Sequence, residues 1–225
     1  ACEGAKVRDI REAGGNRLCI GIQSITPAHL KALGRIHADR EARDALDSAR
    51  ANFDNFNLDL MYGLPAQTPD EALADIETAL AFSPQHLSAY HLTLEPNTYF
   101  HRYPPSLPDD DATAQMQDAL ETRLAAAGFR HYETSAFAIP GRQARHNMNY
   151  WTFADYLGIG AGAHSKISCS DRITRQVRFK QPRQYMQSAV AGDAIQEQHA
   201  VDGDEIGFEF MMNALRLTGG FPLVL

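Results

Sequence analysis

The chain has 225 residues, a formal charge of −7 at pH 7 and 44% hydrophobic residues. This length permits one large domain or one and a half with a real core, and the composition is that of a folded globular protein rather than a fibrous or disordered one. The acidic balance disfavours nonspecific nucleic-acid binding, because it repels a polyanion. No apolar run approaches the roughly 18 to 20 residues that span a bilayer; peripheral membrane association stays open.

The cysteines indicate a reducing compartment. Cys2, Cys19 and Cys169 are an odd set without CxxC spacing, which argues against a disulfide framework and a four-thiolate metal site within the chain. The N-terminus lacks a hydrophobic signal region, so we expect a cytoplasmic protein. The first residue is not Met, and we therefore expect a piece of a longer protein.

The first half of the sequence alternates strands with helices. Apolar patterns predict strands at residues 17–23, 56–62 and 86–94. Helices are expected from Pro27 and over residues 42–51 and 70–82, and Thr26 and Thr68 each supply an N-cap before a proline. Units of about 30 to 40 residues in this order predict an α/β fold with parallel strands joined by crossovers.

The second half of the sequence predicts one long helix followed by shorter elements. A proline-rich stretch at residues 103–108 marks a boundary between residues 1–103 and 104–225. A helix should follow from the acidic residues 109–111 to about Ala127, with Gly128 as its C-terminal cap. Beyond it, we expect strands at residues 132–137, 163–168 and 173–179, and helices at residues 182–191 and 205–217. This region is predicted to be α+β.

Each of the first three strands has one polar face, because successive side chains point to opposite sides. Apolar residues such as Leu18, Ile20, Leu58 and Leu60 alternate with the polar-face set Cys19, Gly21, Gln23, Asn57 and Asp59. In the third strand, the pattern to Leu94 assigns Ala89, His91, Thr93 and Glu95 to the polar face, and Ser88, Tyr90, Leu92 and Leu94 to the other. Parallel sheets are normally apolar on both faces, so something polar must meet this one.

Asp59 is the most informative of these residues, because a buried carboxylate needs a partner. It forms an internal salt bridge to Arg17 or Arg35, or it lines a ligand site with Gln23, Thr93 and Glu95 near the carboxyl ends of the strands, as in α/β barrels. Three strands cannot close a barrel. We therefore expect either further strands outside this chain or a sheet that is covered differently.

Five ordered motifs carry a family resemblance. They are NRLCIGIQS at residues 16–24, LGRIH at 33–37, NLDLMYGLP at 57–65, HNMNYW at 146–151 and GIGAGAHS at 158–165. Together they resemble the HemW branch of radical S-adenosylmethionine (SAM) proteins, which is related to oxygen-independent coproporphyrinogen III oxidase. The resemblance implies the last three βα units of a partial (β/α) barrel over residues 1–103, followed by an α+β C-terminal region, incomplete at its end, over residues 104–225.

The resemblance also implies cofactors. Such proteins hold a 4Fe-4S cluster on a CxxxCxxC loop, and SAM on the open iron. This loop is absent here, so the resemblance implies that the chain alone neither builds the cluster nor cleaves SAM. It assigns Gln23, Arg35, Asp59, Thr93 and His164 to the SAM pocket; amides, carboxylates and guanidinium groups suit the hydroxyls, ammonium and carboxylate of that ligand. Alternatively, Arg35 is a surface partner of Asp39 or Glu41.

The HNxxYW motif is associated with haem binding in this branch. The resemblance implies that His146 ligates the iron, while Tyr150 and Trp151 offer flat apolar contact. The alternative is that His146 and Asn147 form a hydrogen-bonded turn and Trp151 belongs to the core. His164 replaces an aliphatic residue that the coproporphyrinogen-oxidising relatives carry beside the reaction centre, which weakens the case for that reaction.

A basic segment, residues 171–183, offers a second haem contact. Its cations lie beside apolar residues and suit haem propionates; the alternative is an edge strand that its charges protect from aggregation. Three functions stay open for the chain. It belongs to a haem chaperone that passes haem to acceptor proteins, to an enzyme that decarboxylates coproporphyrinogen III anaerobically, or it is a folded piece without activity of its own.

Overall fold

The structure is a computed structural model that describes residues 4–35 and 39–222. By its contacts the chain divides into two compact units, Ala1–Gln143 (unit 1) and Ala144–Leu225 (unit 2), and each is described by itself. The boundary expected between residues 103 and 104 concerns the end of the barrel repeats and stays a prediction. In the described ranges, no helix has the length and apolar character needed to cross a membrane.

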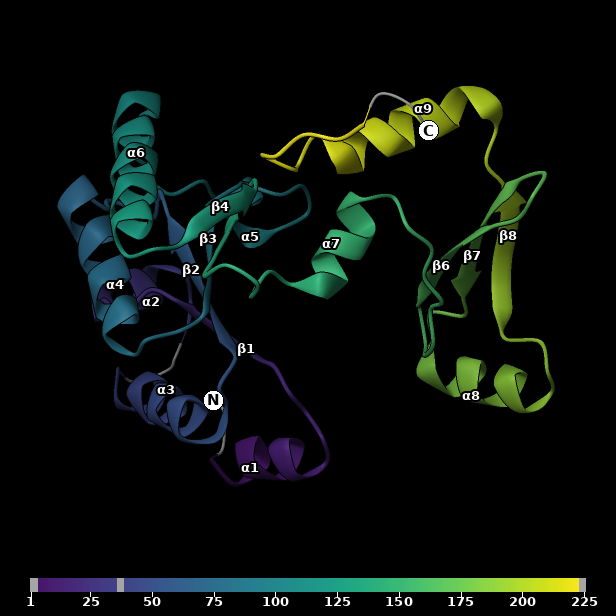
Figure 1. The fold of residues 1–225 in the computed structure, drawn as a ribbon, viewed down its shortest axis with the longest axis horizontal. Coiled ribbons are helices and arrows are strands. Elements are labelled where there is room, and N and C mark those ends of the chain that lie inside the picture. The colour runs from purple at the N-terminus through teal and green to yellow at the C-terminus, as the bar shows by residue number, and fades with distance from the viewer. Residues whose placement is uncertain (1–3, 36–38, 223–225) are drawn as a thin grey trace. The chain divides into compact units, whose positions relative to one another are not determined.

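Unit 1 is built on a five-stranded sheet in the order β1-β2-β3-β5-β4. Figure 1 shows the chain of this unit in purple to teal. Its strands are β1 (Leu18–Gln23), β2 (Phe56–Tyr62), β3 (His86–His91), β4 (Arg130–Glu133) and β5 (Ala136–Ala138). The first three strands are parallel, whereas β5 pairs antiparallel with both β3 and β4. The predicted α/β class and the parallel arrangement of the first three strands are therefore confirmed.

Helices of unit 1 begin at Pro27, Pro69 and Asp110, as the sequence predicts, although Thr26 makes no side-chain cap hydrogen bond before the first of them. The helices of this unit are α1 (Gly4–Glu12), α2 (Pro27–Ala32), α3 (Asp39–Asn52), α4 (Pro69–Ala81), α5 (Tyr99–Arg102) and α6 (Asp110–Ala126). Thr68 forms a capping box, in which its hydroxyl accepts from the Glu71 amide at 3.3 Å and its own amide donates to the Glu71 carboxylate at 2.8 Å. The Asp109 carboxylate caps α6 by accepting from the Ala112 amide at 2.8 Å. Such caps satisfy helix-end amides that have no partner within the helix.

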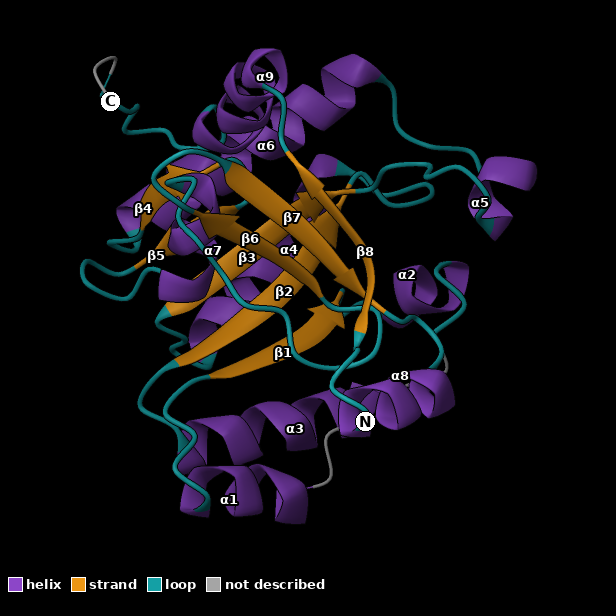
Figure 2. Ribbon diagram, turned by 90° about the vertical axis from the view of Figure 1, so that its right-hand side faces the viewer, coloured by secondary structure: helices purple, strands orange, loops and turns teal. Residues whose placement is uncertain are grey.

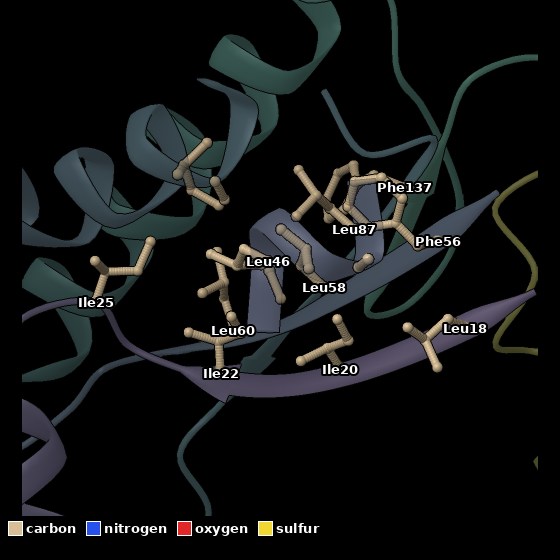
Figure 3. Close-up of a cluster of buried hydrophobic side chains, with 14 of the residues drawn as sticks. Leu18, Ile20, Ile22, Ile25, Leu46, Phe56, Leu58, Leu60, Leu87 and Phe137 are labelled. Carbon is tan, nitrogen blue, oxygen red and sulfur yellow. The ribbon is translucent and has the colours of Figure 1, made fainter. Parts of the chain in front are cut away.

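The core lies between one face of this sheet and helices α3, α4 and α6 (Figure 3). Ile20, Leu58 and Leu87 occupy adjacent register positions on this face and are buried. They pack with Leu46 from α3 and Ile76 from α4. The alternation seen in the sequence thus separates an apolar face, which the helices cover, from a polar face on the opposite side.

The polar face of β3 differs from the prediction. Ser88 pairs in register with Asp59 and Tyr90 with Met61, so Ser88 and Tyr90 belong to the polar face, and Ala89 and His91 do not. Leu87 fixes which side chains of β3 share a face, because it is fully buried in register with Leu58 on the apolar face. The prediction failed because it extended the strand to Leu94, whereas β3 ends at His91 and the residues beyond form a loop.

Residues 132–137 also differ from the prediction of one strand. They belong to a hairpin, in which β4 and β5 are joined by a turn at Thr134 and Ser135. The Ser135 carbonyl accepts from the Ala89 amide of β3 at 2.8 Å. The hairpin extends the parallel sheet on the β3 side.

Unit 2 contains a three-stranded antiparallel sheet in the order β6-β7-β8 (Figure 2). Its elements are α7 (Arg145–Trp151), β6 (His164–Ser168), β7 (Ile173–Arg178), α8 (Pro182–Val190), β8 (Ile195–Ala200) and α9 (Gly203–Ala214). The α+β class expected for this region is confirmed. The edge-strand interpretation of the basic segment is wrong, because β7 is the central strand.

Candidate functional site

The candidate site in unit 1 is the polar face of the sheet, on the side opposite the packed helices. It is formed by the side chains of Cys19, Gln23, Asn57, Asp59, His86, Ser88 and Tyr90, together with Gly21. Cys19 and Gly21 are exposed, Gln23 and Asp59 are half-buried, and Tyr90 is 41% exposed. Asn57, His86 and Ser88 are buried, and the helices that pack on β1 and β2 in the described part of unit 1 lie on the opposite face.

Gln23 has an unusual backbone and an unsatisfied side chain. Its φ is +66°, in the left-handed region that few non-glycine residues adopt, at the point where the pairing of β1 with β2 shifts register. Its carboxamide folds back over Gly21, where an added Cβ would lie 2.9 Å from the Gln23 Nε2. The Gln23 Oε1 is buried without a hydrogen-bond partner among the described residues. Such an orphaned acceptor suits a ligand hydroxyl.

A buried carboxylate holds the turn that follows Gln23. Asp75 of α4 accepts hydrogen bonds from the Ser24 hydroxyl at 2.6 Å, the Ile25 amide at 3.0 Å and the Thr26 hydroxyl at 3.3 Å. Burial raises the pKa of Asp75, and these hydrogen bonds oppose the rise. Sequence analysis did not identify this residue, because its partners lie about 50 positions away in the chain.

Asp59 is positioned by a neighbouring amide rather than by a cation. Its Oδ1 accepts a hydrogen bond from the Asn57 Nδ2 at 2.7 Å. Among the described residues it forms no ion pair: Arg17 donates instead to the Asn55 side chain and to the Arg142 carbonyl, and Arg35 is exposed. The salt-bridge interpretation of Asp59 is therefore not supported, and its carboxylate remains available on the polar face.

Asn57, which positions Asp59, also belongs to a buried polar network that sequence analysis did not identify. The His86 Nδ1 lies 2.6 Å from the Asn57 Oδ1, and its Nε2 lies 2.7 Å from the Tyr132 hydroxyl. Ser88 donates to the same Asn57 oxygen at 3.2 Å. Burial of the imidazole, aided by the charge of Arg17, lowers the pKa of His86 to about 3, so this ring is neutral at pH 7.

Thr93 lies in the loop after β3, and the cleft that it lines includes neither Gln23 nor Asp59. Thr93 and Glu95 are exposed and line an open cleft of about 540 Å³ together with Lys31, Leu33, Gly34 and Tyr99. Arg35 follows directly in the chain, but it is not among the residues that line the cleft. The assignment of Thr93 and Arg35 to one pocket with Gln23 and Asp59 therefore stays a prediction. Asp39 and Glu41, the alternative partners of Arg35, lie in a stretch whose side chains the structure does not describe.

In unit 2, the HNxxYW motif forms the helix α7 rather than a turn. His146 is exposed, and its ring packs edge-on against Tyr150 at a centroid distance of 4.8 Å. Tyr150 packs in the same manner against Tyr156 at 4.7 Å. Trp151 is partly buried, with the Arg216 guanidinium 4.3 Å from its ring centroid. The motif therefore presents an exposed imidazole on an aromatic support.

His164 begins β6 opposite Val177 and is exposed. Close packing requires a glycine at position 158, because a Cβ added there would collide with the His164 carbonyl oxygen. His164 lies in unit 2, whereas the other residues assigned to the SAM pocket lie in unit 1. Its part in that pocket stays a prediction.

The central cations of the basic segment, Arg175 and Arg178, contact groups within unit 2. Arg175 donates to the Tyr156 hydroxyl at 2.8 Å and pairs with Glu209 at 2.5 Å, and the Arg178 side chain donates to the Gly158 carbonyl at 3.3 Å. Arg172 is exposed beside Asp171. Arg175 and Arg178 are thus held by contacts within unit 2, whereas Arg172, Lys180 and Arg183 are exposed.

The described residues contain no group of three or more histidine, cysteine, aspartate or glutamate side chains placed to hold a metal ion. Cys19 and Cys169 are free, exposed and in different units. These residues therefore do not fit a 4Fe-4S cluster, which needs converging thiolates.

Comparison with known proteins links this geometry to a family. Residues 3–79 match the Radical SAM superfamily. The heme chaperone HemW of Escherichia coli is 47% identical over 218 residues, covering 96% of this chain and 57% of that protein. The HemW proteins of Haemophilus influenzae and Bacillus subtilis are 44% and 35% identical, over 98% and 96% of this chain and 57% of each relative. The chain thus spans little more than half the length of these relatives.

A solved structure shares the fold. Coproporphyrinogen III oxidase (HemN) from Escherichia coli, described as a radical SAM enzyme, matches with a TM-score of 0.75 and 23% identity over 96% of this chain and 52% of that one. At this identity the match shows the fold alone. The resemblance to HemW-type radical SAM proteins that the five motifs predicted is confirmed along nearly the whole chain.

Proposed function

We propose that this chain is part of a HemW-type haem chaperone, which binds haem and transfers it to acceptor proteins, and that its polar face binds SAM. Similarity to several proteins named heme chaperone HemW supports the first part. The second part depends on one observation, a row of hydrophilic side chains on the side of the sheet opposite the packed helices of unit 1.

The residues of the polar face fit the chemistry of SAM. The unsatisfied Gln23 Oε1 and the Asp59 carboxylate are acceptors for ribose hydroxyls or the ammonium group. Exposed Arg35 offers a guanidinium for the carboxylate of the ligand, and Thr93 offers a hydroxyl from the adjoining loop. In radical SAM proteins a 4Fe-4S cluster supplies the electron that cleaves SAM. Because the described residues do not fit a cluster, the role proposed for this chain is to bind and orient the nucleoside.

Haem is the proposed cargo of unit 2, with His146 as the candidate iron ligand. An exposed imidazole with no hydrogen bond among the described residues is free to bind the iron, and the Tyr150 ring fixes its position from one side. Tyr150 and the partly buried Trp151 offer aromatic surface to the macrocycle. Cytoplasmic location belongs to the same proposal, supported by the exposed free thiols of Cys19 and Cys169.

The test is an anaerobic haem titration of the complete protein that carries this sequence. We expect saturable uptake with a Soret band and subsequent transfer to apomyoglobin, used as a haem-accepting probe. His146→Ala should shift the band and weaken binding, whereas His199→Ala, at another exposed histidine of unit 2, should not. Conversion of coproporphyrinogen III without haem transfer would overturn the proposal in favour of an enzyme. An unchanged His146→Ala spectrum would move the ligand elsewhere.

A further inference from the structure

We infer that Tyr132, His86 and Asn57 form a one-way hydrogen-bond relay that fixes the orientation of Asp59 on the polar face. The relay holds one carboxylate oxygen and leaves the other for a ligand. This inference deepens the proposed function, because it treats Asp59 as a ligand-binding residue. Tyr132, His86 and Asn57 are positioning residues that act through Asp59.

The direction of the relay follows from the donors and acceptors. An ionised carboxylate only accepts hydrogen bonds, so the Asn57 atom 2.7 Å from the Asp59 Oδ1 must be Nδ2. The Asn57 Oδ1 then faces the His86 Nδ1 at 2.6 Å, and this nitrogen must carry a proton. A neutral imidazole has a single N–H, so its Nε2 accepts from the Tyr132 hydroxyl at 2.7 Å. Each assignment of a donor and an acceptor therefore leaves only one possible assignment for the next hydrogen bond.

His86 can connect Tyr132 to Asn57 because it is buried and neutral. Its side chain is 1% exposed, so an unpaired ring nitrogen would be costly and a charged ring more so. The lowered pKa of His86 agrees with the neutral ring that the relay requires. Ser88 adds a second donor to the Asn57 Oδ1 and reinforces the orientation of the amide.

The relay crosses the sheet from an element outside the parallel repeats. Tyr132 lies on β4, and β5 lies between β4 and β3. β5 places Ala138 in register with His86 and Ala136 with Ser88. Because both side chains are small and buried, they leave room for the Tyr132 ring to reach His86 edge-on, at a centroid distance of 5.6 Å. The hairpin therefore contributes to the candidate site, although none of its residues was predicted to belong to it.

At the end of the relay, Asp59 has a single hydrogen-bond partner among the described residues. Its side chain is half-buried, and its Oδ2 has no hydrogen-bond partner among the described residues. A fixed carboxylate loses little conformational freedom when a hydroxyl or ammonium group binds to it. The relay is therefore expected to raise ligand affinity without touching the ligand.

The first test needs no ligand. In the complete protein labelled with ¹⁵N in histidine and asparagine, the nitrogen shifts should show His86 protonated at Nδ1 and accepting at Nε2. Tyr132→Phe should shift the His86 Nε2 resonance and an Asn57 side-chain amide proton. Tyr62→Phe removes a hydroxyl from the opposite face of the sheet and should leave both signals unchanged. A proton on Nε2, or His86 and Asn57 signals that ignore Tyr132→Phe, would refute the relay.

The second test measures SAM affinity by calorimetry in a double-mutant cycle. Tyr132→Phe should weaken binding about 2- to 10-fold, the range that corresponds to one neutral hydrogen bond. The loss should largely vanish when Asp59→Ala is already present, because that change removes the acceptor through which the relay acts. Equal losses in both backgrounds would identify general structural damage and refute positioning. If the unmodified protein binds no SAM, the proposed site fails, and the nitrogen shifts decide the relay by themselves.

Discussion

Acidification should destabilise unit 1 through His86, because the folded chain holds this imidazole neutral in a buried site. Its pKa is lowered from 6.5 to about 3, so the unfolded state binds more protons between these values. The stability that His86 contributes is therefore complete above pH 6.5 and is lost progressively as the pH falls towards 3.

The size of this effect follows from the pKa shift. Each pH unit below 6.5 should remove up to about 1.4 kcal/mol, which amounts to about 3 kcal/mol at pH 4.5. Such a loss is a large part of the stability of an ordinary domain, about 5 to 15 kcal/mol. Protonation also makes both ring nitrogens donors, so the Tyr132 hydroxyl can no longer donate to the His86 Nε2.

Hydrogen exchange of peptides that cover β2 and β3, corrected for the intrinsic pH dependence, measures this contribution. Between pH 7 and 4.5 the opening free energy should fall less in His86→Gln than in the unmodified protein, by about 3 kcal/mol. His101→Gln, at an exposed histidine of α5, serves as the control and should not change the slope. Equal slopes for His86→Gln and the unmodified protein would refute the assignment of a neutral, buried His86.

Three further substitutions test the local geometry. Asp75→Asn should lower the free energy of unfolding by about 2 kcal/mol, because it disrupts hydrogen bonds to a buried carboxylate. Because the pKa of Asp75 is raised, the unmodified protein should lose stability as the pH rises through that pKa, and Asp75→Asn should not show this loss. Urea titration from pH 4 upward measures both effects. Gly21→Ala should displace the Gln23 carboxamide and weaken SAM binding in calorimetry, with little change in melting temperature. Gly158→Ala should destabilise unit 2 by about 1 to 3 kcal/mol in thermal unfolding, since its Cβ would meet the rigid His164 carbonyl. Wild-type behaviour of any variant would contradict the corresponding contact.

The features that local rules govern could be predicted from the sequence. Strand β2 runs from Phe56 to Tyr62 as predicted, because its alternation of side chains acts over neighbouring residues. The capping box at Thr68 also needs only four residues to be recognised, whereas the cap predicted at Thr26 makes no side-chain hydrogen bond. The polar face followed from the same alternation in β1 and β2, which places Asp59 away from the helices.

The features that depend on distant pairing could not be predicted. Tyr132 and His86 are 46 positions apart, and their contact depends on a hairpin that read as one strand. The face of β3 was misassigned because Leu92 and Leu94 continue its apolar pattern beyond its end. Strand β8 has few apolar residues and is largely exposed, so periodicity gave no signal for it.

The central claim is that the polar face of unit 1 binds SAM, and calorimetry on the complete protein tests it most directly. Asp59→Ala removes a charged acceptor and should weaken binding by at least about tenfold. Asp54→Ala, at an exposed aspartate before β2, should bind as the unmodified protein does. Equal affinities for Asp59→Ala and Asp54→Ala would contradict the claim.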